Sequence, residues 1–253
     1  MDTLTITVIT VCFNSAATIA DTLRSVAEQN HAAVEHIVVD GGSKDGTLEI
    51  IAGTPNRIAR LVSEPDRGIY DAMNKGLAMA TGDVVGFLNS DDVYADAETL
   101  SEIVRVFADP EVEACYGDVL FVAADDPACV VRYWRAGSCR PGRLAQGWMP
   151  PHPTFYVRRR AYDEHGGFDI SYQLQADFEM AIRLVEIHKL NISYLPRTLV
   201  RMRMGGASNA SIGNVIRGNR EAYRAARKHS LPVGPLFPLK KILSRIPQFL
   251  DRP

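Results

Sequence analysis

Two adjacent carboxylates, Asp91 and Asp92, end a short apolar run and are the clearest candidates for chemistry in this sequence. The run before them, from Val84 to Leu88, predicts a strand that is buried on both faces of a parallel sheet. Because ligands collect beyond the carboxyl ends of such strands, we expect both side chains on the floor of a crevice. Neighbouring carboxylates repel unless a cation or protein donors satisfy them, and oxygen ligands suit Mg²⁺ or Mn²⁺. An ordinary turn that caps the following helix is the alternative, and this stretch alone does not decide between the two.

Other polar residues occupy positions where they could bind or react. Asp40 ends a second predicted strand and could accept a hydrogen bond from a base or a ribose hydroxyl, or simply cap its turn. Asp177 lies in the first turn of a predicted helix, where the helix dipole favours the ionised carboxylate, which suits a cap and a general base equally. Trp148 and His152 lie in a loop with three prolines, a kind of loop that often forms one wall of a pocket. A histidine in such a loop is more often structural than catalytic.

The elements that must position these residues alternate regularly in the first third of the chain. The apolar patterns predict β-α-β-α-β-α-β over residues 5–88, and such connections require a parallel sheet. Gly41, Gly42 and Gly46 follow the second strand, but their spacing is not GxGxxG, which disfavours a dinucleotide-binding domain. The predicted strands are 5–13, 36–40, 60–63 and 84–88, and the predicted helices are 17–29, 47–52 and 69–80.

Beyond Asp92 the alternation stops. Two predicted strands flank a polar turn at Asp125–Pro127, which indicates a meander and therefore a small mixed β part. We expect one α/β domain whose mostly parallel, Rossmann-like central sheet is flanked by helices, with residues 1–95 and 96–210 as its halves and 211–253 as a helical tail. The later predicted strands are 114–122, 130–134, 154–157 and 191–199, and the later predicted helices are 97–107, 212–229 and one that opens near residue 175.

Composition limits the class of protein. A chain of 253 residues suffices for one large α/β domain with an ample core. Its cysteines show no CxxC or Cys/His spacing, so we expect reduced thiols rather than a zinc site or a disulfide framework. The N-terminus leads almost directly into a strand, which leaves no room for a signal peptide, and no apolar run approaches the length of a membrane span. These features predict a cytoplasmic protein. The cysteines are Cys12, Cys115, Cys129 and Cys139.

The net charge of −2 hides a basic end of the chain. Residues 201–253 contain eleven Lys/Arg and two Asp/Glu, whereas the rest of the chain is acidic. The segment 236–250 mixes large apolar residues with cations, which is typical of a helix at a membrane interface, although its prolines oppose that interpretation. A helix docked on the body of the protein is an equal alternative. Nucleic-acid binding is disfavoured because the aromatic residues of a stacking surface are absent.

Three segments together resemble the family 2 glycosyltransferases with the GT-A fold, particularly the bacterial enzymes of capsule, exopolysaccharide and lipopolysaccharide assembly. They are Val39–Thr47, Ser63–Gly76 and Gly82–Asp92, and the resemblance covers about residues 5–210. It implies a nucleoside-diphosphate-sugar donor, a Mn²⁺ or Mg²⁺ cofactor and an inverting reaction. The residues that the resemblance assigns are Phe13 beside the base, Asp40 on the base, Arg67, Asp71 and Asn74 along the donor, Asp91 near the ribose and sugar, Asp92 on the metal, and Asp177 as the base.

The sequence also departs from the family pattern. Ala176 stands where many members have a glutamate before the catalytic aspartate, so the base assignment rests on Asp177 alone. The Gln-x-x-Arg-Trp motif of processive synthases is missing, and the late loop 204–208 has no histidine that could add a metal ligand. We therefore expect non-processive transfer of a hexose to a saccharide or lipid-linked saccharide, with Trp148 and His152 on the acceptor side. Residues 230–253 would contact the anionic inner face of the membrane.

Two other functions remain as alternatives. A nucleotidyltransferase acting on sugar phosphates also uses a metal and an α/β sheet, but it usually opens with a glycine-rich phosphate loop, and residues 14–17 contain no glycine. A non-catalytic protein that binds nucleotide sugars would keep the fold without turnover, and the presence of Asp91, Asp92 and Asp177 argues against it.

Overall fold

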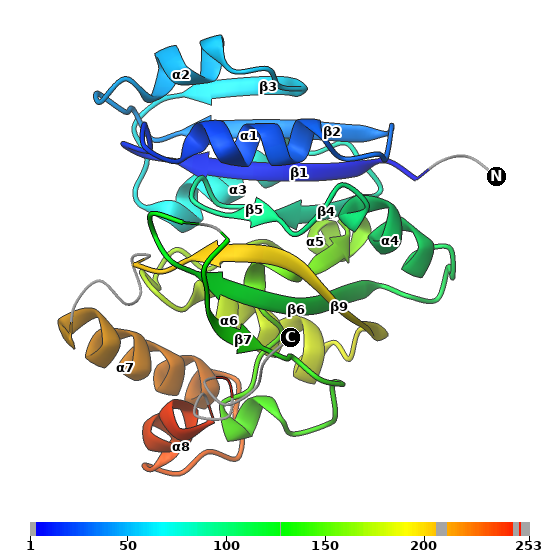
Figure 1. Cartoon of the computed structure of the whole chain (residues 1–253). Helices are drawn as coiled ribbons and strands as arrows, with labels where there is room; N and C mark the ends of the chain where they lie inside the picture. Colours follow the sequence, from blue (N-terminus) through cyan, green and yellow to red (C-terminus); the bar gives the residue numbers. More distant parts are fainter. Residues whose placement is uncertain (1–3, 127, 206–211, 245–247, 249–253) are drawn as a thin grey trace.

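The first half of the chain forms the parallel part of a single large sheet (Figure 1). The computed structural model describes residues 4–126, 128–205, 212–244 and 248. Within them β1 pairs in parallel with β2 and β4, and β2 pairs in parallel with β3, so the predicted alternation is confirmed. The elements of this half are β1 (Ile6–Cys12), α1 (Ile19–Ala27), β2 (Val34–Asp40), α2 (Thr47–Gly53), β3 (Ile58–Ser63), α3 (Ile69–Met79) and β4 (Val84–Phe87).

The second half continues the sheet with mixed pairing. In the described residues the strand order is β3-β2-β1-β4-β8-β6-β9-β5, with β7 paired to β6. β8 is antiparallel to both β4 and β6, whereas β9 is parallel to β6. These elements are β5 (Val93–Tyr94), α4 (Thr99–Val106), β6 (Ala114–Val122), β7 (Val130–Trp134), the short helices η1 (Leu144–Gln146) and η2 (His152–Thr154), β8 (Tyr156–Arg158), α5 (Arg159–His165), α6 (Ala176–Ala181), its π-helical continuation η3 (Ile182–Ile187) and β9 (Ile192–Arg203).

Burial explains why these segments take these forms. Every residue of β1 is buried, as a continuous β-branched run in a central strand predicts. The stripe Ile19, Leu23 and Val26 of α1 is fully buried, which confirms the helical spacing. Gly86 in β4 allows a close approach, because a Cβ there would lie 2.2 Å from the ring of Tyr156. The two halves of the sheet are therefore joined by tight packing as well as by strand pairing.

The C-terminal tail docks on the body of the domain. It forms α7 (Ile212–Lys228) and α8 (Phe237–Leu243). Ala222, Ala225, Ala226 and Phe237 are buried and belong to the same hydrophobic core as Phe87 of β4. Figure 1 shows both helices on the side of the molecule away from α2 and β3. The predicted tail is thus helical, while its last part, 245–253, lies outside the described residues except for position 248. Among the helices described, none is long and apolar enough to cross a bilayer.

Candidate functional site

A cleft of about 620 Å³ lies at the carboxyl ends of β1 and β4. Such a position is expected for a ligand site in a doubly wound sheet, and the volume suits a small organic ligand. Its walls come from the loop after β1, the loop after β4, η2, the start of α6 and the end of β9. Of the residues predicted from the sequence, the cleft brings together Phe13, Asp91, His152 and Asp177.

The two adjacent carboxylates after β4 occupy different environments. Asp91 lines the cleft, whereas Asp92 is fully buried and lies outside the lining. Neither carboxylate oxygen of Asp92 has a hydrogen-bond partner in the described structure. Burial, and next the charge of Asp91, raise the pKa of the Asp92 carboxyl well above its usual value. The metal role expected of Asp92 stays a prediction: its side chain lies outside the cleft lining, while its two unpartnered oxygens are a feature that a bound cation would satisfy.

Asn89 and Asp91 present two oxygen donors on the same wall of the cleft. The amide oxygen of Asn89 is buried and has no hydrogen-bond partner in the part of the chain described. Burial raises the pKa of the Asp91 carboxyl, and the Arg203 charge opposes this shift. A hard cation would give the Asn89 oxygen a partner and would stabilise the partly buried charge of Asp91, so these residues fit a divalent metal. No group of three or more His, Cys, Asp or Glu side chains in the described residues could hold a metal alone.

Arg203, at the end of β9, is a cleft residue that the sequence did not reveal. Its Nη2 donates to the Asp21 carboxylate at 2.6 Å, and its Nη1 donates to the backbone carbonyl of Asp91 at 3.4 Å. The side chain is largely buried, and its Nε finds no acceptor among the described residues. A mostly buried guanidinium beside Asp91 supplies positive charge where an anionic ligand would lie. The predicted strand stopped at residue 199, which is why this residue was not placed in the cleft.

Asp177 reaches the cleft from the first turn of α6. Its Oδ1 accepts hydrogen bonds from the Phe178 backbone N–H at 2.8 Å and from the Tyr70 hydroxyl at 3.2 Å. Burial, and next the charge of Asp177, raise the pKa of the Tyr70 phenol, which therefore remains a donor. Within the described chain no donor contacts the other oxygen, Oδ2. The carboxylate is thus held through one oxygen and presents the second to the cleft.

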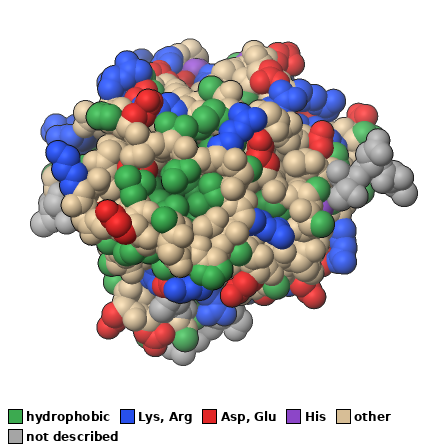
Figure 2. All heavy atoms as spheres, turned by 90° about the horizontal axis from the view of Figure 1, so that it is seen from above, with side chains coloured by type: hydrophobic (Ala, Val, Ile, Leu, Met, Phe, Trp, Pro, Cys, Tyr) green, Lys and Arg blue, Asp and Glu red, His purple; other side chains and the backbone are tan. Residues whose placement is uncertain are grey.

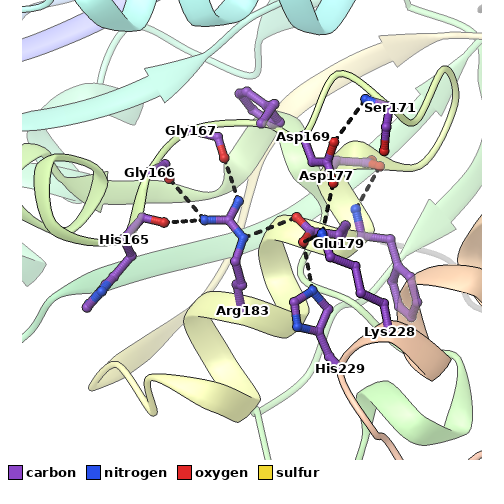
Figure 3. A network of polar contacts seen from close by, with 12 residues as sticks. His165, Gly166, Gly167, Asp169, Ser171, Asp177, Glu179, Arg183, Lys228 and His229 are labelled. Atoms are coloured by element: carbon purple, nitrogen blue, oxygen red, sulfur yellow. Dashed lines mark hydrogen bonds and ion pairs between the residues drawn. The ribbon is translucent and has the colours of Figure 1, made fainter.

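A buried network fixes the helix that carries Asp177 (Figure 3). Glu179 is fully buried and accepts from Arg183 at 3.1 Å, Lys228 at 3.2 Å and His229 at 2.7 Å. Arg183 also donates to the backbone carbonyls of residues 165–167. Burial would raise the pKa of Glu179, but the hydrogen bonds from these partners and the charge of Arg183 outweigh it and lower the pKa. The network therefore ties α6 to α7 and to the loop that precedes Phe168.

His152 lines the same cleft as Asp177 and lies in an aromatic setting. Its ring stacks on Phe87 at 5.6 Å and meets Phe168 edge-on at 5.7 Å between centroids. Its Nε2 is buried without a hydrogen-bond partner in the described structure. Burial lowers the pKa of the imidazole, and the charge of Asp177 opposes that shift. A neutral imidazole with an unused nitrogen thus lies on the wall shared with Asp177.

Asp40 and Asn74 were both expected to bind the donor, but in the structure their side chains form hydrogen bonds with other parts of the protein. Asp40 is fully buried at the end of β2, where it accepts from the backbone N–H groups of residues 42 and 43 and from the hydroxyls of Ser43 and Ser63. Burial would raise the pKa of Asp40, but these hydrogen bonds lower it. Asn74 makes two 2.8 Å hydrogen bonds to the backbone of Phe168. Neither residue lines the cleft, so their expected roles on the donor stay predictions.

Arg67, Asp71 and Trp148 also lie outside the cleft lining. Arg67 and Asp71 form an ion pair at 2.8 Å at the start of α3, and the arginine side chain is mostly exposed. The indole of Trp148 donates to the Ala136 carbonyl at 2.8 Å, with the Arg143 guanidinium above its ring. The structure thus gives these three residues local partners rather than a place on the cleft wall.

A sheet that is parallel in one half and mixed in the other, with an acidic cleft where the halves meet, is the arrangement of a GT-A glycosyltransferase. The mannosyltransferase PcManGT of Pyrobaculum calidifontis, solved with GDP-Man and Mn²⁺, superimposes with a TM-score of 0.67 at 24% identity, over 96% of this chain and 68% of that chain. TarS 1–349 of Staphylococcus aureus, solved with UDP-GlcNAc, gives a TM-score of 0.68 at 18% identity, over 98% and 72%. These likenesses confirm the predicted fold class.

The family follows from the sequence relatives. The Glycosyl transferase family 2 profile matches residues 7–171, and the chain belongs to this family. It is 32% identical over 183 residues to an uncharacterized glycosyltransferase of Mycobacterium tuberculosis H37Rv, covering 71% of this chain and 68% of that protein. It is 30% identical over 204 residues to the PGL/p-HBAD biosynthesis glycosyltransferase of Mycobacterium bovis BCG, covering 79% and 77%. The protein is therefore a glycosyltransferase, as the sequence predicted.

Proposed function

We propose that the protein transfers a hexose, with inversion, from a nucleoside-diphosphate sugar to an acceptor hydroxyl in cell-surface polysaccharide or glycolipid synthesis. One observation carries this proposal: Asp91 and Asp177, from different halves of the sheet, face the same cleft of about 620 Å³. The sugar nucleotides bound by the mannosyltransferase and by TarS support the choice of donor. We assign donor binding mainly to residues 1–95 and acceptor binding and catalysis to residues 96–210.

The donor side of the cleft suits a diphosphate and a metal. Asp91 and Asn89 would hold Mn²⁺ or Mg²⁺, which when bound supplies charge stabilisation to the departing diphosphate. Arg203 adds a mostly buried positive charge on this side, held by Asp21. Phe13 is 63% exposed at the mouth of the cleft and offers a ring on which the base can stack. Asp92, whose two buried oxygens have no partner among the described residues, remains a further candidate ligand of the metal.

Asp177 is the proposed general base. Its Oδ2 takes the proton from the acceptor hydroxyl while the oxygen of that hydroxyl bonds to the anomeric carbon. The bond from that carbon to the diphosphate breaks on the opposite face, and the nucleoside diphosphate leaves with the electron pair. Tyr70 and the Phe178 N–H hold Oδ1, so the carboxylate is oriented before the acceptor arrives. His152, neutral and unpartnered at Nε2, can accept a hydrogen bond from a second acceptor hydroxyl.

The acceptor we propose is a saccharide or a lipid-linked saccharide, used without processive elongation. The PGL/p-HBAD biosynthesis relative supports a glycolipid or saccharide acceptor. The basic balance of residues 201–253 supports peripheral contact of residues 230–253 with the anionic inner face of the membrane.

A donor panel with isosteric variants tests the reaction. Release of nucleoside diphosphate is measured with UDP-, GDP- and dTDP-sugars in Mn²⁺, in Mg²⁺ and in EDTA. We expect Asp177→Asn to lower kcat about 10²–10⁴-fold and Asp91→Asn to weaken activation by the metal. Asp92→Asn separates the two adjacent carboxylates, because weakened metal activation in this variant as well would show that both acids bind the metal. Full activity of Asp177→Asn or of Asp91→Asn would refute the corresponding role, and release of pyrophosphate would indicate nucleotidyl transfer instead.

A further inference from the structure

The outward face of α8 is an exposed apolar surface. Leu236, Leu239, Ile242 and Leu243 are 64%, 51%, 46% and 50% exposed. They lie within eight consecutive residues, and Lys240 is exposed among them. Single exposed apolar side chains are common on protein surfaces, but three on one short helix and a fourth at its N-cap indicate a contact surface.

The inward face of the same helix contacts the start of the catalytic helix. Phe237 is buried, and its ring lies 6.0 Å from that of Phe178 between centroids. Lys241 is 3% exposed, donates to the side-chain carbonyl of Gln175 and places its Nζ 4.2 Å from the centroid of the Phe178 ring. Gly147 makes room for this approach, because a Cβ there would lie 2.7 Å from the Cα of Lys241. A lysine so deeply buried is held by specific partners.

The two residues that Lys241 contacts flank the proposed base. Gln175 is the last residue before α6, and Phe178 donates its backbone N–H to the Oδ1 of Asp177. A displacement of α8 would therefore move the first turn of α6, on which Asp177 lies. We propose that the outward face of α8 docks on an anionic lipid surface and that Lys241 is a positioning residue for Asp177, so that membrane contact raises the rate of transfer.

Charge argues for lipid as the occupant of this face. The two tail helices carry exposed cations at Arg217, Arg220, Arg224, Arg227 and Lys240 against the single acidic residue Glu221, and basic helices with exposed leucines suit an anionic bilayer. Figure 2 shows hydrophobic side chains gathered on a different face, the one on which α2 and β3 lie uppermost. Leu61 of β3 is 46% exposed there. β3 forms the edge of the sheet opposite to β9 and β5, so Leu61 provides an exposed leucine at a distant part of the sheet as a control.

Lipid binding is measured first, because it does not depend on activity. The full chain is sedimented with vesicles of phosphatidylglycerol and phosphatidylcholine, and with vesicles of phosphatidylcholine alone. We expect binding to the anionic vesicles only, weakened about ten- to a hundredfold in the double variant Leu239→Ser/Leu243→Ser and unchanged in Leu61→Ser. Equal binding by the double variant would overturn the docking surface. A wild-type dimer that the double variant converts to a monomer would assign the face to a second copy of the chain instead.

The coupling of membrane contact at α8 to the position of Asp177 rests on the proposed function. It is measured separately, with a water-soluble acceptor. Anionic vesicles should raise the kcat of the wild type several-fold. Lys241→Met should lower kcat and abolish the stimulation while leaving the donor KM unchanged, and Lys241→Arg should restore part of both. Wild-type kcat and stimulation in a folded Lys241→Met protein would refute the positioning role. Absence of turnover with every donor would refute the proposed function, whereas the sedimentation result would still decide the docking surface.

Discussion

Replacing Glu179 with glutamine removes the one negative charge at the centre of the network in Figure 3. The carboxylate is fully buried and contacts two cationic side chains, Arg183 and Lys228, and the imidazole of His229. Glutamine has the same shape, and its side-chain oxygen can still accept a hydrogen bond from Arg183. Its NH₂ group, however, would face the N–H groups of Lys228 and His229, so donors would oppose donors. We therefore expect Glu179→Gln to loosen the attachment of α6 to α7 without creating a cavity.

The size of the effect follows from the contacts that survive. Removing one partner of a buried ion pair costs about 3–5 kcal/mol. Two features reduce this figure. Lys228 is half-exposed and retains its ion pair with Asp169 at 2.8 Å, and Arg183 retains its hydrogen bonds to the backbone carbonyls of residues 165–167. We expect a loss of about 2–3 kcal/mol in the free energy of unfolding, which lowers the Tm by about 4–12 °C in a domain of this size.

Thermal unfolding measured between pH 4 and pH 8 is the assay. The pKa of Glu179 is lowered in the folded protein, so its contribution is present above about pH 4.5 and is lost as the pH falls through the lower folded pKa. The Tm difference between wild type and Glu179→Gln should therefore narrow in acid. Glu64→Gln, which breaks an exposed ion pair with Lys75, is the control and should cost less than about 1 kcal/mol. Equal Tm values for Glu179→Gln and wild type at pH 7 would refute the reasoning.

Three further substitutions test the roles of other residues. Asn74→Ala removes two hydrogen bonds to the Phe168 backbone and should lower the free energy of unfolding by about 2 kcal/mol. A large loss of nucleotide affinity in this variant would instead show that Asn74 binds the donor. Gly86→Ala forces a methyl group against the Tyr156 ring and should cost about 3 kcal/mol or prevent folding; unchanged Tm would show that this packing is loose. Arg203→Met should weaken the binding of nucleoside diphosphates about tenfold, measured by calorimetry, and leave the binding of nucleosides unchanged. An equal loss of affinity for both ligands would refute a contact between Arg203 and the diphosphate.

The parallel half of the sheet could be predicted because its signals are local. Continuous apolar runs marked β1 and β4, and short connections through amphipathic helices required parallel pairing. The bounds of β6 and β7 were also predicted correctly, since a polar turn separates two runs rich in valine and aromatic residues. The remainder depends on distant contacts. The two residues of β5 form a strand only by pairing with β9, and β8 enters the sheet antiparallel between β4 and β6, which nothing in its own sequence specifies.

The sequence predicted which types of residue form the candidate site better than it predicted the direction of their side chains. Paired acids after a buried strand indicated a metal site, but only the structure shows that Asp91 reaches the cleft and Asp92 does not. Asp40 ends a strand as predicted, yet neighbouring hydroxyl and amide groups occupy its oxygens. Arg203 gave no signal, because a single arginine at the end of a half-buried strand resembles any surface cation. Side-chain direction at a strand end depends on the residues that pack around it.

The proposed base is supported from three separate parts of the chain. Tyr70 of α3 donates to its carboxylate, the Glu179 network ties its helix to α7, and Lys241 of α8 contacts the residues on either side of it. Because Asp177 lies on a helix of only six residues that is followed by a π-helical segment, its own helix supplies little rigidity. The precision that general base catalysis needs must then come from these outside contacts. Substitutions in α7 and α8, which lie outside the cleft, should therefore lower kcat while leaving donor affinity intact.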